Sequence, residues 1–146
     1  MIAPRLTRLV WRIYNFGYEE TRPFHKIALR EWRVLATLGR FGRLSVGEIS
    51  RITGGGHTVV SKAAKSLRSK GYVEATQSAA DKRQTLVELT PDGLAAHDEI
   101  APVRTKLLTE VEMGLTAAER KTLLRLCSKL ERWLDAASEE DGDGWA

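Results

Sequence analysis

The stretch from residue 44 to residue 90 limits the possible folds more than any other part of the sequence. It opens with a capping box, Ser45-Val46-Gly47-Glu48, flanked by Leu44 and Ile49, which marks the start of a helix. The run Thr53-Gly54-Gly55-Gly56 must end that helix, because glycine readily adopts the left-handed conformation that closes a helix and reverses the chain. We therefore expect a short helix followed by a tight turn.

A second helix is expected to begin directly after the glycines, near His57 or Thr58. Over residues 58–69 a period of about 3.6 residues separates the side chains onto two faces. One face carries Val60, Ala63, Ala64 and Leu67, which should pack, and the other carries Thr58, Ser61, Lys62, Lys65 and Ser69, which should be exposed. Two helices joined by a tight turn, the second with a polar outer face, are the outline of a helix-turn-helix.

Two strands joined by a basic turn are predicted after the second helix. Gly71 stops the helix, residues 72–77 alternate large and small side chains as a strand does, and residues 85–89 return as a second strand. Their connection, residues 78–83, is too long for a two-residue hairpin turn and ends in the cations Lys82 and Arg83. A basic hairpin at this place predicts a winged helix-turn-helix.

The charge pattern of this stretch suits a polyanionic partner. Between Glu48 and Glu74 the sequence has no acidic residue but contains Arg51, Lys62, Lys65, Arg68 and Lys70, and the chain carries a net charge of +4. We predict that the second helix enters the major groove of double-stranded DNA and that the amides at its start bind a phosphate. The predicted contacts are Gly56, His57, Thr58, Val59, Ser61, Lys62, Lys65 and Arg68, with Lys82 of the hairpin on a phosphate.

The same stretch resembles the MarR family of bacterial winged-helix regulators. The matching segments are Glu31-Trp32-Arg33-Val34-Leu35, Leu44-Ser45-Val46-Gly47-Glu48-Ile49, Leu67-Arg68-Ser69-Lys70-Gly71-Tyr72-Val73 and, most specifically, Asp81-Lys82-Arg83 followed by Val87-Glu88-Leu89-Thr90 and Gly93. The resemblance covers roughly residues 5 to 135. It implies a homodimeric regulator that binds a palindromic operator, in which Arg83 reaches into the minor groove and Asp81 orients it. The narrow groove of A·T-rich DNA attracts a guanidinium group.

Two departures from the family pattern affect the predicted contacts. Lys62 stands where the family usually has an arginine after a serine, and an ammonium group cannot hold guanine through two parallel hydrogen bonds as a guanidinium does. The run Gly54-Gly55-Gly56 makes the turn looser than is usual in the family. We therefore expect a weaker guanine contact at Lys62.

Helical patterns surround this stretch on both sides. Apolar residues recur with helical spacing over residues 4–18, from about residue 23 or 25 to residue 40, from residue 90 to about residue 114, and over residues 116–137. The first of these helices and the last two are more apolar than a compact winged helix needs. A second copy of the chain is the expected cover, because twofold homodimers are the commonest oligomers.

The predicted fold is mainly α with a small two- to three-stranded β wing. We expect a single MarR-like domain of residues 1–146, in which residues 28–90 form the DNA-binding lobe and residues 1–22 and 91–137 form dimerisation helices. Residues 138–146 are acidic and have no apolar period, which predicts a disordered tail.

A group of aromatic and basic residues could line a pocket where the first, second and fifth helices meet. The candidate ligand-binding residues are Trp11, Arg12, Tyr14, His25 and Trp32. The resemblance implies that a small aromatic or phenolic effector binds there and releases the DNA, which would make the protein a repressor. For any single one of these residues, an ordinary core or dimer-interface role is the better explanation, so the prediction concerns the pocket as a whole. A ligand-independent DNA-binding regulator and a winged-helix protein-interaction module therefore remain alternatives.

The sequence lacks the features of several other classes of protein. Cys127 is the only cysteine, so neither an intramolecular disulfide nor a Cys-cluster zinc site can form, and we expect a buried, unreactive thiol. The histidines lack metal-site spacing, and no activated nucleophile or phosphate-binding loop is evident, so we expect no metal, no cofactor and no enzymatic activity. Without an apolar run of ~20 residues or an export signal, the chain is expected in the cytoplasm.

Overall fold

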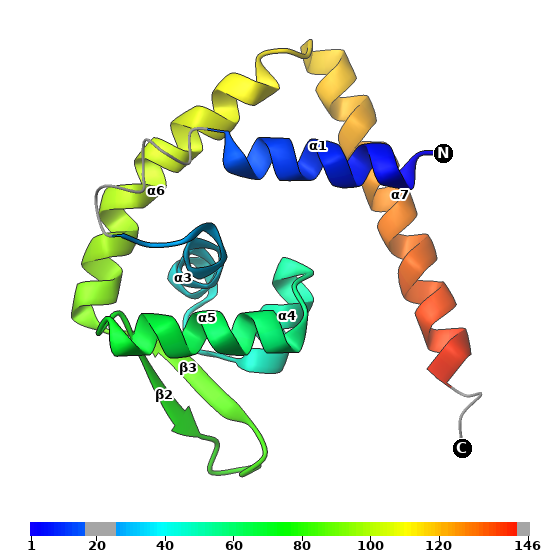
Figure 1. The fold of residues 1–146 in the computed structure, drawn as a ribbon. Helices are drawn as coiled ribbons and strands as arrows, with labels where there is room; N and C mark the ends of the chain where they lie inside the picture. The colour runs from blue at the N-terminus through cyan, green and yellow to red at the C-terminus, as the bar shows by residue number, and fades with distance from the viewer. Residues whose placement is uncertain (17–25, 143–146) are drawn as a thin grey trace. The chain divides into compact units, whose positions relative to one another are not determined.

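The computed structural model describes residues 1–16 and 26–142, which form two compact units, residues 1–108 and the residues from 109 onward. The first unit contains α1 (Ala3–Asn15), α3 (Leu29–Phe41), β1 (Leu44–Ser45), α4 (Val46–Thr53), α5 (His57–Ser69), β2 (Val73–Gln77), β3 (Thr85–Leu89) and most of α6 (Pro91–Glu112). The second unit contains the end of α6 and α7 (Ala117–Gly142), and most of these elements are labelled in Figure 1. The predicted fold class, mainly α with a small β wing, is confirmed.

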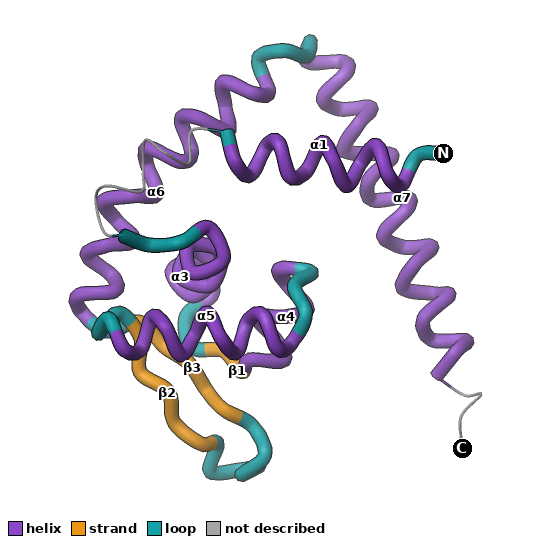
Figure 2. The backbone as a smooth tube through the Cα atoms, in the orientation of Figure 1, coloured by secondary structure: helices purple, strands orange, loops and turns teal. Residues whose placement is uncertain are grey.

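A three-stranded antiparallel sheet forms the wing, with the strand order β1-β3-β2. In the hairpin Val73 pairs with Leu89 and Gln77 pairs with Thr85, so residues 78–84 remain as the connecting loop. Leu44 of β1 pairs with Val87 on the other side of β3. Figure 2 shows the hairpin extending away from α5, with the loop in teal at its far end. The predicted basic turn is therefore the tip of a projecting hairpin.

The core of the DNA-binding lobe lies between α3, α4, α5 and the sheet. Its largest fully buried side chains are Val34, Leu35, Leu38, Ile49, Leu67, Val73 and Val87. Each buried leucine or isoleucine contributes about 1.5–3 kcal/mol relative to an exposed one. The inner face of α5 consists of Val60, Ala63, Ala64 and Leu67, as the helical period predicted. This packing fixes α5 by one face and leaves the opposite face free.

The start of α4 follows the predicted capping box. The Ser45 hydroxyl accepts the N–H of Glu48 at 3.1 Å, and the Glu48 carboxylate accepts the N–H of Ser45 at 2.7 Å. Hydrogen bonds that the backbone and the side chain of Ser45 make to the Glu48 carboxylate lower the pKa of Glu48 below its ordinary value. The helix ends at Thr53 and is capped by Gly54, whose φ of +66° is the left-handed conformation that the glycine run predicted.

Helix α3 begins later than the sequence predicted. The apolar pattern placed its start near residue 23 or 25, outside the described residues, but residues 26–28 are not helical and the helix starts at Leu29. The N–H of Ala28 donates to the Glu31 carboxylate at 2.6 Å, which caps the helix at that point. Alanine is an unusual N-cap residue, so the sequence carried little signal for this start.

Helix α7 corrects the prediction for the acidic tail. It begins with a second capping box between Thr116 and Glu119, as expected, but it continues to Gly142, so residues 138–142 are helical and not disordered. The Ser138 hydroxyl donates to the Leu134 carbonyl at 2.8 Å, and nothing between Ser138 and Asp141 breaks a helix. Cys127 is exposed in the single chain, so the prediction of a buried thiol is wrong there.

Candidate nucleic-acid interface

The predicted DNA-contacting residues of α5 lie on its outer face. Gly56 is the N-cap of the helix, and the exposed residues are Gly56, His57, Thr58, Val59, Lys62, Lys65 and Arg68, with Ser61 half-buried. Helix α5 contains no aspartate or glutamate. Its outer face is therefore a row of donors and cations without a competing negative charge, and we call α5 the recognition helix.

The tip of the wing is organised by Asp81. The Asp81 carboxylate accepts the backbone N–H of Arg83 at 3.0 Å, and its carbonyl accepts the N–H of Gln84 at 2.9 Å. Its own N–H donates to the Ser78 hydroxyl at 3.3 Å. The resemblance implied that Asp81 orients the Arg83 side chain, whereas the contact here is with the Arg83 backbone. Asp81, Lys82 and Arg83 are all exposed, so both cations remain available.

A hollow of about 380 Å³ joins the recognition helix to the wing. It is lined by Ser45, Val46, Gly47, His57, Ser61, Ala64, Lys65, Arg68, Ala75, Arg83, Gln84, Thr85 and Val87, and we call it the wing hollow. It brings Arg83 to the same concave surface as Lys65 and Arg68, although these residues are far apart in the sequence. No acidic residue is among those that line it. The start of α4, residues 45–47, also lines the wing hollow; it was not among the predicted DNA contacts, and the capping box was its only signal in the sequence.

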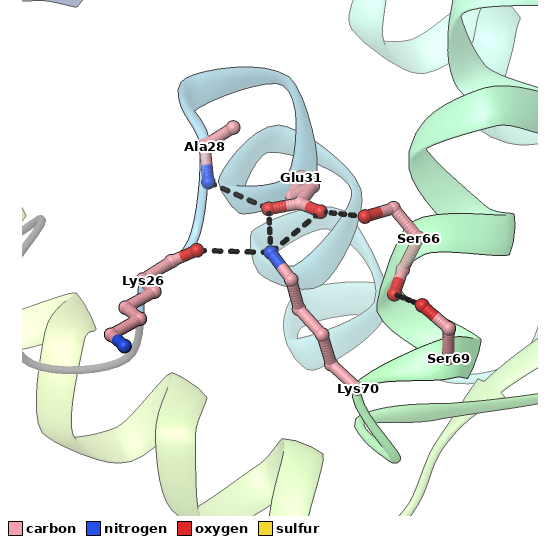
Figure 3. Close-up of polar contacts among 6 residues, drawn as sticks. All are labelled: Lys26, Ala28, Glu31, Ser66, Ser69 and Lys70. Atoms are coloured by element: carbon pink, nitrogen blue, oxygen red, sulfur yellow. Dashed lines mark hydrogen bonds and ion pairs between the residues drawn. The ribbon is translucent and has the colours of Figure 1, made fainter.

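An ion-pair network fixes the end of the recognition helix (Figure 3). The Lys70 ammonium lies 2.8 and 2.9 Å from the two carboxylate oxygens of Glu31 and donates to the Lys26 carbonyl at 2.9 Å. The Ser66 hydroxyl also donates to Glu31. Burial alone would raise the pKa of Glu31, but the hydrogen bonds from Lys70, Ser66 and Ala28, with the charge of Lys70, lower it below its ordinary value. The charge of Lys70 is therefore paired within the chain, and Lys70 is not a free cation for DNA.

A second joint ties the same end of α5 to α6. The Thr90 hydroxyl donates to the Gly71 carbonyl at 2.6 Å and accepts the N–H of Gly93 at 3.0 Å. A Cβ at Gly93 would lie 1.9 Å from the Tyr72 carbonyl oxygen, so only glycine fits there. The Leu-Thr-x-x-Gly part of the sequence signature is thus a structural joint and not a DNA contact.

The predicted ligand-binding residues divide between two hollows. The first, of about 320 Å³, is lined by Val10, Trp11, Tyr14, Leu29, Arg30, Arg33, Thr53 and Gly54, and we call it the turn hollow. The second, of about 390 Å³, is lined by Tyr14, Trp32, Arg33, Ala36, Thr37, Arg40, Phe41, Ile52, Thr53, Arg104 and Leu108, and we call it the α6 hollow. Arg12 is exposed and lines neither, and His25 lies outside the described residues. The predicted set is therefore not one pocket, and the arginines that do line the hollows, Arg30, Arg33, Arg40 and Arg104, were not predicted.

Buried packing explains part of this region without a ligand. The Trp32 ring stacks on His97 with 5.8 Å between the ring centres. A Cβ at Gly39 would lie 2.4 Å from that imidazole, so the glycine makes room for it. Arg104 is buried and donates to the carbonyls of Tyr14 at 3.0 Å and Phe16 at 3.2 Å, and burial lowers the pKa of its guanidinium. These contacts fasten the end of α1 to α6.

Neither a metal site nor a membrane-spanning helix is found in the part of the chain that the structure describes. Within residues 1–16 and 26–142, no group of three His, Cys, Asp or Glu side chains could hold a metal ion. In the same part of the chain, no helix combines the length and the apolar character needed to cross a membrane. The surface formed by the recognition helix and the wing is therefore the strongest candidate for function.

A three-helix lobe with a basic exposed helix and a projecting basic hairpin defines a winged helix-turn-helix that binds DNA. Residues 25–84 match the sequence profile of the MarR family. Together with the relatives described next, this match supports a helix-turn-helix transcriptional regulator of the MarR type. The family is not enzymatic, which agrees with the sequence prediction.

The relatives span most of the chain. YwaE of Bacillus subtilis (strain 168), an HTH-type transcriptional regulator, is 26% identical over 129 residues, which are 88% of this chain and 75% of YwaE. The structure of Bordetella bronchiseptica BpsR is similar with a TM-score of 0.77 and 26% identity, covering 89% of this chain and 98% of that one. The structure of E. coli MarR without ligand is similar with a TM-score of 0.65 and 26% identity, covering 87% and 94%.

Proposed function

We propose that this DNA-binding regulator is a homodimeric repressor that leaves a palindromic operator when a small aromatic, anionic or phenolic ligand binds. The observation that carries the proposal is the position of the turn hollow. Aromatic rings and guanidinium groups line it together with Thr53 and Gly54 of the helix-turn-helix turn, directly before the recognition helix. A ligand there would contact the DNA-binding element itself.

The DNA contacts follow from the shape of the wing hollow. The recognition helix enters the major groove, where Thr58, Ser61 and Lys62 meet base edges, and Val59 touches a thymine methyl group. Lys65 and Arg68 lie toward the wing and meet the phosphate backbone between the grooves. Arg83 enters the adjacent minor groove, where a narrow A·T tract favours its charge, and Lys82 holds a phosphate.

The dimer contact is proposed for residues 1–22 and 91–137, of which residues 17–22 lie outside the described residues. Large apolar side chains are exposed on both α1 and α7, among them Trp11 at 52% and Trp133 at 67%. Exposed apolar patches of this kind mark interaction sites, and a second copy supplies a self-complementary partner. Light scattering should show a dimer at micromolar concentration, and a monomer there would contradict the proposal.

Two relatives support the effector and the DNA contact by analogy. The BpsR structure concerns regulation of the DNA binding of that protein by 6-hydroxynicotinic acid, which is an aromatic carboxylic acid. The Streptococcus pneumoniae FabT structure, 19% identical, is a complex of that protein with DNA.

The first test measures DNA binding. Duplexes that the purified protein retains from a random pool should contain half-sites about one helical turn apart. By fluorescence anisotropy, log K should fall with log salt with a slope of about 0.9 per phosphate neutralised. Arg83→Ala should weaken binding without loss of stability, most at operators with A·T-rich flanks, whereas Lys106→Ala, an exposed cation of α6, should not. Salt-independent binding would favour a protein-interaction module instead.

The second test measures effector release. Calorimetry with a panel of aromatic acids and phenols, including 6-hydroxynicotinate, should identify a ligand that weakens operator binding. Such switches usually have a coupling free energy of about 1–3 kcal/mol. If no member of the panel binds or changes DNA affinity, the protein is a ligand-independent regulator.

A further inference from the structure

Arg33 of α3 connects the helix-turn-helix turn to the hollows. Its guanidinium carbon lies 4.7 Å from the centre of the Tyr14 ring in α1, a cation–π contact. Its Nη2 donates to the carbonyl oxygen of Thr53, a residue 20 positions further along the chain. It also lines both the turn hollow and the α6 hollow. One side chain therefore touches α1, the last residue of α4 and the space that a ligand could occupy.

Thr53 holds the turn through both its backbone and its side chain. Its carbonyl belongs to the last turn of α4, where carbonyls lack partners within the helix and carry the negative end of the helix dipole. A guanidinium is a suitable cap for such a group. The Thr53 hydroxyl accepts the N–H of Gly55 at 3.2 Å and donates to the Ile49 carbonyl at 2.8 Å. The recognition helix begins only four residues later, at His57.

The glycines of the turn add little restraint of their own. A Cβ placed on Gly54 or on Gly56 would meet no atom within 4 Å, so the space around both residues is open. Glycine also has the widest choice of backbone conformations. The hydrogen bonds of Thr53, including the one from Arg33, are therefore the polar contacts that set where the recognition helix starts.

We propose that Arg33 positions the recognition helix by holding the Thr53 carbonyl, and that a ligand carrying an aromatic ring and a carboxylate releases DNA by drawing the guanidinium away. This inference rests on the proposed effector function. In the turn hollow such a ligand lies against the rings of Trp11 and Tyr14 and meets the guanidinium groups of Arg30 and Arg33. No acidic residue is among those that line this hollow.

The exchange of partners favours the ligand. A carboxylate carries a full negative charge and can accept two parallel hydrogen bonds from a guanidinium, so it competes well with the neutral Thr53 carbonyl for Arg33. The guanidinium is a rigid planar fork, and turning it to face a carboxylate turns Nη2 away from Thr53. Without this cap the turn samples more conformations, and the recognition helix presents its contacts less often in the geometry that DNA requires.

The first experiment needs no ligand. Arg33→Met should weaken operator binding about two- to thirtyfold, the range for mutations of residues that carry coupling. The slope of log K against log salt should stay unchanged, because Arg33 contacts no phosphate, whereas loss of a phosphate contact would lower it by about 0.9. Arg43→Met is the matched control, since Arg43 is an exposed arginine just past the end of α3 that lines neither the turn hollow nor the α6 hollow. Unchanged affinity in Arg33→Met, or a lower slope, would overturn the proposal.

Hydrogen exchange separates positioning from general stability. In Arg33→Met, the amides of residues 54–58 should exchange faster while those of β2 and β3 keep their rates. Faster exchange throughout the lobe would show a merely structural role. Arg33→Lys keeps a charge and a donor and should recover part of the affinity and protection. If Arg33→Met does not fold, Arg33→Lys takes its place. It should then show the same changes in operator affinity and in amide exchange at residues 54–58, but smaller. Affinity and exchange rates equal to those of the parent would contradict the proposal.

The ligand experiment uses benzoate, with benzamide as the uncharged control of the same shape. Benzoate should lower operator affinity of the parent several-fold and speed exchange at residues 54–58, as Arg33→Met does, and benzamide should do neither. Arg33→Met should show no further response. If benzoate releases DNA equally from the parent and from Arg33→Met, effector release stands and the role of Arg33 is overturned. If benzoate has no effect while Arg33→Met binds weakly, the positioning role stands and release by this class of ligand is contradicted.

Discussion

The recognition helix is held differently at its two ends. At its carboxyl end, Lys70 bonds to Glu31 and to the Lys26 carbonyl, and Thr90 bonds to the Gly71 carbonyl. At its start, Gly54 and Gly56 have open space around them, and the polar restraints come from Thr53 and Arg33. One end is clamped by two neighbouring helices and the other is attached by a few hydrogen bonds. The DNA-binding surface can therefore be adjusted at its start without unfolding the lobe.

The largest expected effect is at the clamped end, with Gly93→Ala. The added Cβ would lie 1.9 Å from the Tyr72 carbonyl oxygen, and backbone cannot move aside cheaply. Overpacking usually costs about 1–3 kcal/mol, and a clash with backbone should fall at or above the top of that range. Urea unfolding should show the loss, and Gly47→Ala is the control, because its nearest contact would be an ordinary 3.8 Å. Equal stability of the two variants would mean that the joint between α5 and α6 is not rigid.

Glu31→Gln should have the next largest effect. It removes the charge that pairs with Lys70 while keeping an acceptor for Ala28, so a loss of about 1–3 kcal/mol in unfolding free energy is expected. The loss should depend on pH. Because the folded-state pKa of Glu31 is lowered below its ordinary value of 4.5, its stabilisation is complete above about that pH and disappears as pH falls through the folded value.

The measurement for Glu31 is a series of urea titrations of the parent and Glu31→Gln from neutral to acid pH. The difference between them should be constant above pH 4.5 and shrink below it. Glu110→Gln serves as the control, since Glu110 is an exposed carboxylate of α6 that takes no part in the Lys70 network. A difference that grew as pH fell would contradict the ion-pair explanation of the clamped end.

At the other end, Gly54→Ala should cost less, about 1 kcal/mol. Its φ of +66° is disfavoured for residues with a Cβ, although no atom lies near enough to clash. Asparagine tolerates this conformation better, so Gly54→Asn should recover much of the loss. If alanine and asparagine are equally costly by thermal unfolding, the strain is not in the backbone conformation.

The smallest stability effect is expected for Gly56→Ala. Its φ of −64° suits any residue, and its Cβ would meet nothing within 4 Å, so unfolding free energy should change by less than about 1 kcal/mol. Operator affinity should still fall, because a methyl group at the N-cap obstructs close approach of a phosphate to the helix amides. Unchanged DNA affinity would show that the start of α5 does not contact the phosphate backbone.

The elements on which this comparison rests could be predicted from local signals. Ser45 and Glu48 are three residues apart, and the glycines that follow α4 are consecutive, so the helix-turn-helix was visible within a short window. The inner face of α5 followed from its period alone. Local signals failed at Ala28, because alanine is an unusual residue at the N-cap of a helix. They also failed at Ser138, because a polar segment there continues helix α7.

The contacts that distinguish the two ends could not be predicted in this way. Arg33 and Thr53 are 20 residues apart, and Lys70 and Glu31 are 39 apart, so each contact depends on how α3 packs against the other helices. The sequence therefore suggested Lys70 as a free cation and offered no role for Arg33. The same limit explains why the predicted ligand pocket was wrong as a single site. Trp11 and Trp32 were expected to line one pocket, but they line different hollows.

Asp81 organises the tip of the wing before any DNA is present, through its bonds to the backbone of Arg83 and Gln84 and to Ser78. Ordering the backbone of one residue costs about 1–2 kcal/mol, so a tip that is already ordered leaves only side chains to immobilise. The hairpin does not have to fold during the encounter, and charge attraction alone can set the speed of arrival. Differences between operators should then be expressed in residence time, with fast and similar arrival at each site.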